Sequence, residues 1–300
     1  MVSIRRARHA CRARNRKGGE RVMKAIIPAS GLGTRFLPGT KAIPKELLLL
    51  MNKPVIQYGV EEALNAGFDE VIIVNSHAKP AIEEHFAPNP DLVNELRSRG
   101  KDAYANEVER TGNLPVSFVY QNEALGLGHA VYCGAEKTAN ESFAVILGDT
   151  VVPEADILKQ MVAISNQHDG SIVLAAMPVN PEAVERFGII DGYKIEDGIL
   201  KVNSVVEKPA KSEAPTNYAI FGRYILTPRV MDLLETTQPG AGGEIQLTDA
   251  ILSALRQEEA YALIIDPNDV FDTGTVEGWI EANTELLARA NATKETCNHE

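Results

Sequence analysis

Cysteine is scarce in this chain of 300 residues, and none of its apolar runs is long. The three cysteines, Cys11, Cys133 and Cys297, are odd in number and far apart. That pattern argues against a disulfide framework or a cysteine-based metal site and suits a reducing cytoplasm. Apolar runs such as residues 47–51 are far shorter than the about 18 residues that a membrane-spanning helix needs. We therefore expect a cytoplasmic protein without a membrane segment.

Internal repeats, low-complexity tracts and Pro/Ser-rich linkers are also missing from the sequence. With 44% hydrophobic residues, a chain of this length can bury a large core. We expect residues 23–300 to form a single folded domain.

Positive charge is concentrated at the beginning of the chain. Residues 1–22 carry eight Lys or Arg residues against Glu20 alone, a charge of +7, which leaves −18 on the rest. A nucleic-acid-binding arm and an organelle-targeting peptide are two interpretations. A secretory signal would require an apolar stretch after the charges, and none is present. The acidic remainder of the chain would repel nucleic acid. We therefore expect a disordered leader with Met23 as the working start, and no nucleic-acid partner.

The most informative stretch begins at residue 25. The apolar residues 25–27 predict a buried strand, which ends at Pro28 in a loop of small residues. Backbone N–H groups of such a loop can approach an anion closely. We expect those around Ala29, Gly31 and Gly33 to hold phosphates or the edge of a nucleoside.

Cations follow this loop within a dozen residues, at Arg35, Lys41 and Lys45. The loop does not end in the Gly-Lys-Ser/Thr of a Walker A motif, and Phe36 stands where a dinucleotide fingerprint needs its third glycine. Backbone donors together with three cations predict a polyphosphate site, and nucleoside triphosphates are the commonest such ligands.

Strands and helices alternate along the first 180 residues. Strands are expected at 24–28, 70–74, 116–120, 143–147 and 171–177, and helices at 54–65, 80–85, 129–138 and 155–167, with an exposed helical insertion at 91–110. This alternation predicts an α/β fold with a Rossmann-like, doubly wound, mostly parallel sheet, which binds ligands at the carboxyl ends of its strands.

Beyond residue 180 the sequence changes to short strands with Gly and Asp turns. We expect antiparallel strands at 188–190, 193–195, 199–206 and 218–225, helices at 229–235 and 245–257, a strand at 261–265 and a closing helix at 276–290. The sheet is therefore expected to be mixed, with a smaller antiparallel portion.

The string from Gly31 to Pro38, followed by Lys41 and by Pro44-Lys45-Glu46, resembles the signature loop of the sugar-1-phosphate nucleotidylyltransferases. Residues 40–46, 126–130 and 243–250 resemble the bacterial UTP–glucose-1-phosphate uridylyltransferases within that family. The resemblance implies a nucleotide-diphospho-sugar transferase fold with a nucleotide half over about 23–180 and a sugar half over about 181–275. It also implies synthesis of UDP-glucose and pyrophosphate from UTP and glucose 1-phosphate, with Mg²⁺, by a dimer or tetramer.

The transfer requires the triphosphate to be held and its charge neutralised. Arg35 is the natural partner of the leaving pyrophosphate, because its guanidinium matches phosphate oxygens bidentately. Lys45 can place a point charge nearer the α-phosphate. Without the surrounding motif, the simplest interpretation of Lys45 would be a solvated surface cation.

Gln121 follows the strand expected at 116–120. Its carboxamide offers one donor and one acceptor, which complements the imide edge of uracil or thymine. Residues 121–130 resemble the base-binding segment of the family, in which Gly126 would let the base lie against the backbone. Glu46 is expected to help bind the nucleoside.

Two aspartates are candidate metal ligands. Asp149 follows the strand expected at 143–147, and Asp272 lies in a turn sequence near the end of the chain. Either could simply cap its own turn, but the resemblance implies that both bind Mg²⁺, which takes one or two carboxylates plus phosphate oxygens. Many relatives have Pro before the metal-binding Asp, whereas this chain has Gly148.

The sugar phosphate is expected to bind at residues 206–209. Lys208 could hold the phosphate during attack, Glu207 could accept hydrogen bonds from sugar hydroxyls, and Gly188 would let the backbone approach the sugar. An ordinary Glu/Lys pair before a loop is the simpler interpretation, but this motif too resembles one of the family.

Three functions remain open from the sequence. The chain could be the uridylyltransferase, a thymidylyltransferase or other sugar-1-phosphate nucleotidylyltransferase of the same fold, or a non-catalytic sensor of sugar nucleotides. A sensor would be expected to lack Arg35, Lys45, Asp149 or Lys208, all of which are present.

Overall fold

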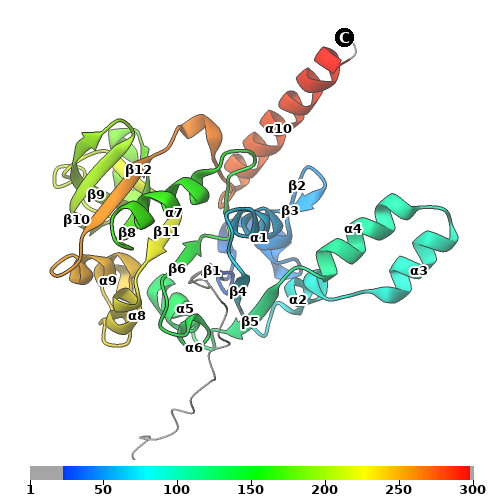
Figure 1. Ribbon diagram of the computed structural model, residues 1–300, viewed down its shortest axis with the longest axis horizontal. Helices are drawn as coiled ribbons and strands as arrows, with labels where there is room; N and C mark the ends of the chain where they lie inside the picture. The colour runs from blue at the N-terminus through cyan, green and yellow to red at the C-terminus, as the bar shows by residue number, and fades with distance from the viewer. Residues whose placement is uncertain (1–22, 298–300) are drawn as a thin grey trace, which may run out of the picture.

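A nine-stranded mixed sheet forms the centre of the computed structural model, which describes residues 23–297 (Figure 1). The basic leader predicted at residues 1–22 lies outside the described residues. In spatial order the strands are β5 (Val116–Tyr120), β4 (Glu70–Asn75), β1 (Lys24–Pro28), β6 (Phe143–Ile146), β11 (Tyr218–Leu226), β8 (Ile172–Pro178), β12 (Ala260–Ile264), β10 (Ile199–Glu207) and β9 (Gly188–Glu196).

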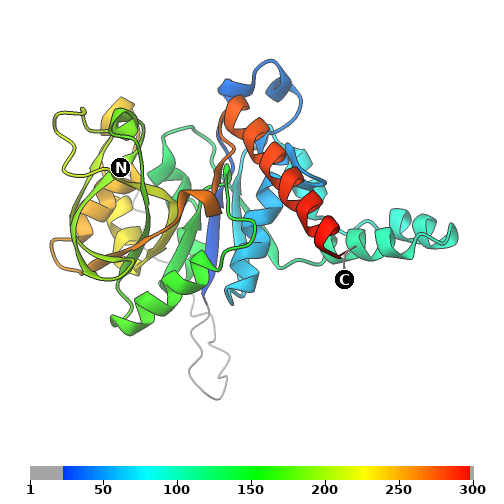
Figure 2. The same ribbon diagram turned by 90° about the horizontal axis from the view of Figure 1, so that it is seen from above.

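The sheet has a parallel half and a largely antiparallel half. Strands β5, β4, β1 and β6 are parallel to one another, whereas β11 runs antiparallel to both β6 and β8. Strands β12, β10 and β9 follow, and the pair Ala219–Ile189 joins β9 back to β11. This half therefore curls into the closed loop of yellow-green strands at one end of Figure 2. The expected mixed α/β architecture is confirmed.

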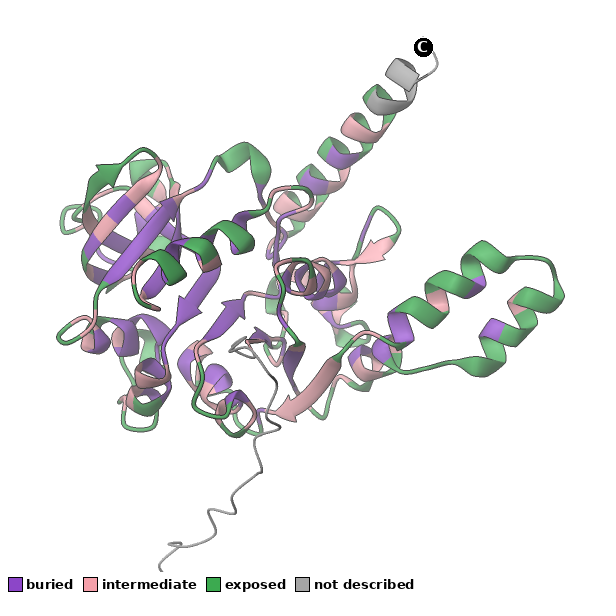
Figure 3. Ribbon diagram, in the orientation of Figure 1, coloured by how far each residue is buried: buried purple, intermediate pink, exposed green. Residues whose placement is uncertain are grey.

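Helices cover both faces of the sheet, and apolar side chains fill the space between them. Helices α1 (Val55–Asn65), α2 (Pro80–Phe86) and α7 (Ile157–Gln167) pack on one face. Helices α5 (Leu127–Tyr132), α8 (Pro228–Leu234) and α9 (Leu247–Ala254) pack on the other, with α6 (Ala135–Thr138) after α5. The central strands are buried on both faces (Figure 3), as expected for a doubly wound sheet.

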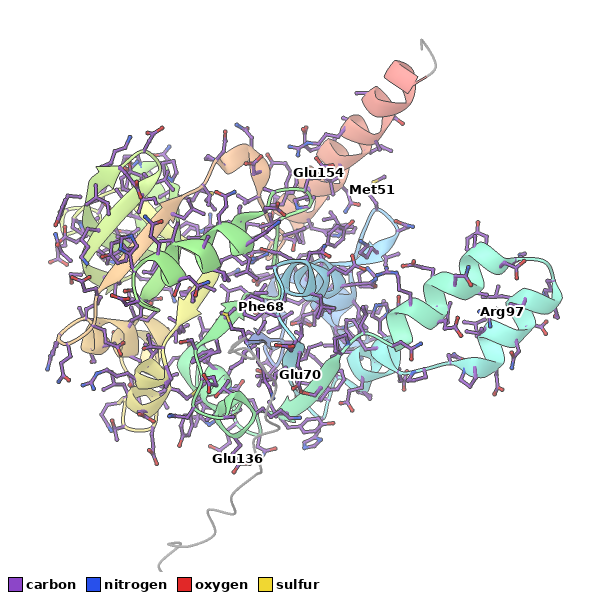
Figure 4. All side chains as sticks on the ribbon, viewed as in Figure 1. Met51, Phe68, Glu70, Arg97, Glu136 and Glu154 are labelled. Carbon is purple, nitrogen blue, oxygen red and sulfur yellow. The ribbon has the colours of Figure 1, made fainter. Side chains whose placement is uncertain are left out.

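Several predicted elements differ in extent, among them the helix expected at 129–138, which is divided into α5 and α6. The insertion at 91–110 is a hairpin of two helices, α3 (Pro90–Ser98) and α4 (Asp102–Gly112), which projects from the body (Figure 1). Arg97 lies on this hairpin, where it pairs with Glu109 at 2.8 Å (Figure 4).

The strands expected at 188–190 and 193–195 form one strand, β9. Gly192 lets the backbone of β9 lie against Lys201, because a Cβ at this position would be 2.5 Å from the Lys201 carbonyl oxygen.

The closing helix is longer than expected, since α10 runs over Val276–Cys297. Within residues 23–297, no helix is long and apolar enough to cross a membrane.

Short elements shape the edge of the sheet where β1, β4, β5 and β6 end. The 3₁₀ turns η1 (Thr34–Phe36), η2 (Gly39–Lys41) and η3 (Lys45–Leu47) follow β1, before the hairpin β2 (Leu49–Leu50)–β3 (Lys53–Pro54). Strand β7 (Thr150–Val151), just after β6, pairs with β13 (Phe271–Asp272). The remaining 3₁₀ turns are η4 (Pro181–Arg186), η5 (Ala241–Gly243) and η6 (Pro267–Asp269). The pairing of β7 with β13 brings the two predicted metal ligands to one place.

Candidate active site

A cavity of about 540 Å³ lies at the carboxyl ends of the parallel strands, where the fold class predicts a ligand. Eight of the predicted site residues line it: Gly31, Gly33, Arg35, Lys45, Glu46, Gln121, Gly126 and Asp149. These residues come from three loops that are distant in sequence and follow β1, β5 and β6. The fold therefore brings together the residues that the sequence assigned to the nucleotide, except Ala29.

The loop after β1 has a defined backbone conformation. Gly33 has a φ of 64°, and its carbonyl oxygen accepts a hydrogen bond from Thr40 Oγ1 at 2.7 Å. A Cβ at Gly33 would also lie 3.2 Å from the Thr40 side chain, so any other residue would be strained there.

Ala29 corrects one expectation from the sequence. Its N–H donates to Val74 O at 2.8 Å, and the residue is buried. That N–H is thus used within the sheet and cannot face a phosphate, because the extended pairing of β1 continues one residue past Pro28. Ala29 anchors the loop, whereas Gly31 and Gly33 line the cavity.

Lys45 and Asp149 form an ion pair inside the cavity. Lys45 Nζ lies 2.5 Å from Asp149 Oδ2. Burial alone would lower the pKa of Lys45, but the carboxylate of Asp149 outweighs that effect and raises its pKa. Lys45 is therefore held as a cation at the wall of the cavity.

Asp149 and Asp272 lie next to each other around Gly274. Asp149 Oδ2 and Asp272 Oδ1 are each 3.0 Å from the position that a Cβ would take at Gly274, so the two oxygens are at most twice that distance apart. Thr273 holds the segment by donating from N and Oγ1 to Asp149 O at 2.8 and 2.9 Å. Arg35 also reaches this point, with Nη1 3.4 Å from Gly274 O.

This pair of carboxylates fits a hard divalent cation that takes its other ligands from phosphate and water. Among residues 23–297, no group of three or more His, Cys, Asp or Glu side chains could hold a metal ion without such help. A metal here would therefore depend on the nucleotide for part of its coordination.

Gln121 is fixed at the end of β5 by its neighbours. Its Oε1 accepts from Ser30 Oγ, and its Nε2 donates to Gly126 O at 3.2 Å and contacts His129 Nδ1 at 2.9 Å. His129, which the sequence suggested only as part of a helix start, therefore orients the predicted base-reading amide. Gly126 has a φ of 106°, and a Cβ on it would lie 2.7 Å from the Glu244 side chain.

The predicted sugar-binding residues form a second cluster. Glu207 pairs with Gly188 across β10 and β9, and its Oε2 accepts from Thr248 Oγ1 at 2.7 Å. Lys208 Nζ lies 3.4 Å from Glu207 Oε1. A Cβ at Gly188 would lie 3.2 Å from Glu207 Oε2, so glycine keeps this corner open.

Tyr224 on β11 is a buried phenol near residues of both clusters. Burial raises the pKa of its phenol, and the nearby carboxylates of Glu207 and Asp149 add to that effect. Glu207, predicted to bind the sugar, and Asp149, predicted to bind the metal, are therefore both close enough to Tyr224 on β11 for their charges to act on its phenol.

Three neighbouring residues were missed by the sequence reasoning. Glu244 lines the cavity, Thr248 binds Glu207, and Lys79 lies beneath the loop after β1. Residues 243–250 carried a family resemblance that could have pointed to Glu244 and Thr248. Lys79 gave no signal, because a lysine before a proline at the start of a short helix is typical of a protein surface.

The chain belongs to the nucleotidyl transferase family, whose sequence profile matches residues 24–289. It is 44% identical over 265 residues to the UTP–glucose-1-phosphate uridylyltransferase of Pseudomonas aeruginosa, covering 87% of this chain and 94% of that protein. A solved UDP-glucose pyrophosphorylase complexed with UDP-glucose is similar in structure, with a TM-score of 0.80, 37% identity, and coverage of 90% of this chain and 100% of that one.

A UTP-bound enzyme of the same kind from Acinetobacter baumannii gives a TM-score of 0.81 at 33% identity, covering 89% of this chain and 93% of that one. These likenesses confirm the resemblance inferred from the motifs.

Proposed function

We propose that this chain is a UTP–glucose-1-phosphate uridylyltransferase, which forms UDP-glucose and pyrophosphate. The observation that carries the proposal is the cavity that Arg35, Lys45 and Asp149 line together with the glycine loop. The likeness over nearly the whole length to a protein named UTP–glucose-1-phosphate uridylyltransferase and to a UDP-glucose pyrophosphorylase supports the choice of UTP and glucose 1-phosphate.

The proposed reaction is a direct displacement at phosphorus. An oxygen of the sugar phosphate attacks the α-phosphorus of UTP, the bond to the bridging α–β oxygen breaks, and pyrophosphate leaves with that electron pair. Lys208 holds the attacking phosphate, Lys45 faces the α-phosphate and Arg35 binds the leaving group. No covalent enzyme intermediate is required, so the residues act by positioning and electrostatic stabilisation.

The base and the sugar are assigned to the two ends of the site. Gln121 and Gly126 would bind the uracil, with Gly31, Gly33 and Glu46 on the nucleotide side of the cavity. Glu207 and Gly188 would bind the hydroxyls of glucose. Gln121 reads only the imide edge, which uracil and thymine share, so thymidylyl transfer remains the second candidate function.

Asp149 and Asp272 would hold the divalent metal, which we propose to be Mg²⁺. When bound, the metal neutralises phosphate charge that the cations of the protein leave uncompensated. We also propose that the protein acts in the cytoplasm and assembles as a dimer or tetramer, which analytical ultracentrifugation would test.

Product formation tests the proposal. UTP and glucose 1-phosphate, incubated with the protein and Mg²⁺, should yield UDP-glucose and pyrophosphate in equal amounts by chromatography. Pyrophosphate release that does not depend on the sugar phosphate, or the absence of both products, would contradict it.

A further inference from the structure

Lys79 lies at the centre of a buried hydrogen-bond network beneath the nucleotide loop. It precedes α2 at the edge of the sheet where β4 ends, and its side chain is only 12% exposed. Its Nζ donates to Ala29 O at 2.8 Å and to both carboxylate oxygens of Glu46, at 3.0 and 2.9 Å. All three hydrogens of the ammonium group are thus directed at the two segments that form the floor of the cavity.

Each partner of Lys79 leads directly to a residue of the proposed site. Ala29 is the first residue of the loop that carries Gly31 and Gly33. The side chain of Glu46 is 1% exposed. Glu46 directly follows Lys45 in η3, and Lys45 is the residue that pairs with Asp149. Lys79 therefore joins the phosphate loop to the lysine expected at the α-phosphate.

The backbone of Lys79 is itself held in place. Asn75 Nδ2 at the end of β4 donates to Lys79 O at 3.1 Å, and Lys79 N donates to Ser76 O at 2.9 Å. The ammonium group thus projects from a backbone that the central sheet anchors. Such support is what keeps catalytic groups within a fraction of an ångström of their working position.

We propose that Lys79 is a positioning residue for nucleotidyl transfer. It acts through its hydrogen bonds to Ala29 and Glu46 and does not touch the substrates. These bonds fix the position of the glycine loop and the orientation of Lys45. This role rests on the proposed function and deepens it. The simpler alternative is that Lys79 only neutralises the buried charge of Glu46.

Steady-state kinetics of Lys79 and Glu46 variants separate these roles. Lys79→Met should raise the KM for UTP and lower kcat, with a combined loss in kcat/KM of about 100-fold, because small displacements of positioned groups cost that much. The double variant Lys79→Met/Glu46→Gln removes the unpaired buried carboxylate, so its thermal midpoint should recover toward that of the unmodified protein. Its KM for UTP should stay above that of Glu46→Gln alone, because only the double variant leaves Ala29 O without its partner. Lys159→Met, at an exposed lysine of α7, is the matched control and should behave as the unmodified protein.

Two results would overturn the inference. One is a Lys79→Met variant with unchanged kinetics; the other is a double variant in which stability and kcat/KM recover together, which would leave Lys79 as a counter-ion alone. Because the unmodified protein is assayed alongside, its own failure to form UDP-glucose would count against the proposed function and not against the role of Lys79.

Discussion

Among single residues, Lys208 and Asp149 are the two whose proposed roles differ most clearly. Lys208 belongs to the cluster with Glu207 and Gly188, outside the cavity that the nucleotide loop encloses. Asp149 lies on the wall of that cavity, beside Lys45. Substitutions at these two positions should therefore disturb different kinetic constants.

Lys208→Ala should lower kcat by about 100-fold and leave the KM for UTP nearly unchanged. The removed charge is placed on the sugar phosphate, and a single stabilising group of this kind is worth roughly that factor. Initial rates with each substrate varied in turn provide the test, with Lys211→Ala, a lysine that pairs with Glu182 outside the cluster, as the control. A rise in the KM for UTP as large as the fall in kcat would remove Lys208 from the sugar side.

Asp149→Asn should abolish turnover at ordinary Mg²⁺ or shift the requirement to much higher concentrations. The carboxylate is one of the two proposed to hold the metal, whose charge stabilisation contributes several kcal/mol to such a step. The measurement is activity as a function of Mg²⁺, with Asp156→Asn, an exposed aspartate that pairs with Lys159, alongside. Unchanged activity and metal dependence would exclude Asp149 from the site.

At the scale of elements, the loops around the cavity depend on close backbone approaches. Gly126, at the start of α5, lies against residues 244 and 245 before α9, and a Cβ there would be 2.7 Å from Glu244 Cβ and 2.8 Å from Ile245 O. The two segments are also joined by hydrogen bonds from Gly128 N to Ile245 O and from Ile245 N to Leu125 O, both at 2.8 Å. Separating them should disturb the wall of the base-binding end.

Gly126→Ala should raise the KM for UTP at least tenfold. Gly198→Ala is a matched control, because Gly198 also has a positive φ, 76°, but no atom lies within 4 Å of its Cβ position. Both variants carry backbone strain of about 1–3 kcal/mol, whereas only the first creates a clash at the cavity. Equal effects of the two substitutions on the KM would show that strain and not the close approach matters.

A buried ion pair ties α1 to the middle of the sheet. Arg223 on β11 is fully buried, pairs with Glu62 on α1 at 2.7 Å, and donates to Thr150 O at 3.0 Å, one residue beyond Asp149. Its donors are all directed at oxygen acceptors, as a buried guanidinium requires. The pair therefore supports both the sheet and strand β7, which directly follows Asp149, the proposed metal ligand.

Glu62→Gln should destabilise the protein by about 3 kcal/mol, because it leaves a buried cation without its counter-charge. Urea unfolding followed by circular dichroism measures the change. Lys194→Ala, in the exposed pair Lys194–Asp197, serves for comparison and should barely move the midpoint. A Glu62→Gln midpoint no lower than that of Lys194→Ala would contradict the assigned role.

At the scale of the whole molecule, sequence patterns predicted the elements that are local and missed those that depend on distant contacts. Strands β1 and β5 match their predicted bounds, since each is a short apolar or β-branched run between turn residues. The pair β7–β13 has strands of two residues each, separated by more than a hundred positions, and no periodicity marks it. The position of β11 between β6 and β8 likewise depends on contacts between segments that are distant in the sequence.

The candidate site shows the same division. Gly33, Lys45 and Asp149 could be predicted because they lie in motifs with a recognisable order. Lys79 could not, because its burial and its bond to Glu46 arise from packing between segments 33 residues apart. The N–H of Ala29 was expected to face the ligand for a related reason: the sequence does not reveal that this N–H continues the sheet.

The most direct measurement is pyrophosphate release with glucose 1-phosphate and Mg²⁺, compared across UTP, dTTP, ATP, CTP and GTP. We predict a strong preference for UTP, with turnover abolished when the metal is chelated. A preference for dTTP would keep the fold and the chemistry of transfer but contradict the proposed substrate, and no release with any nucleotide would contradict the proposed activity.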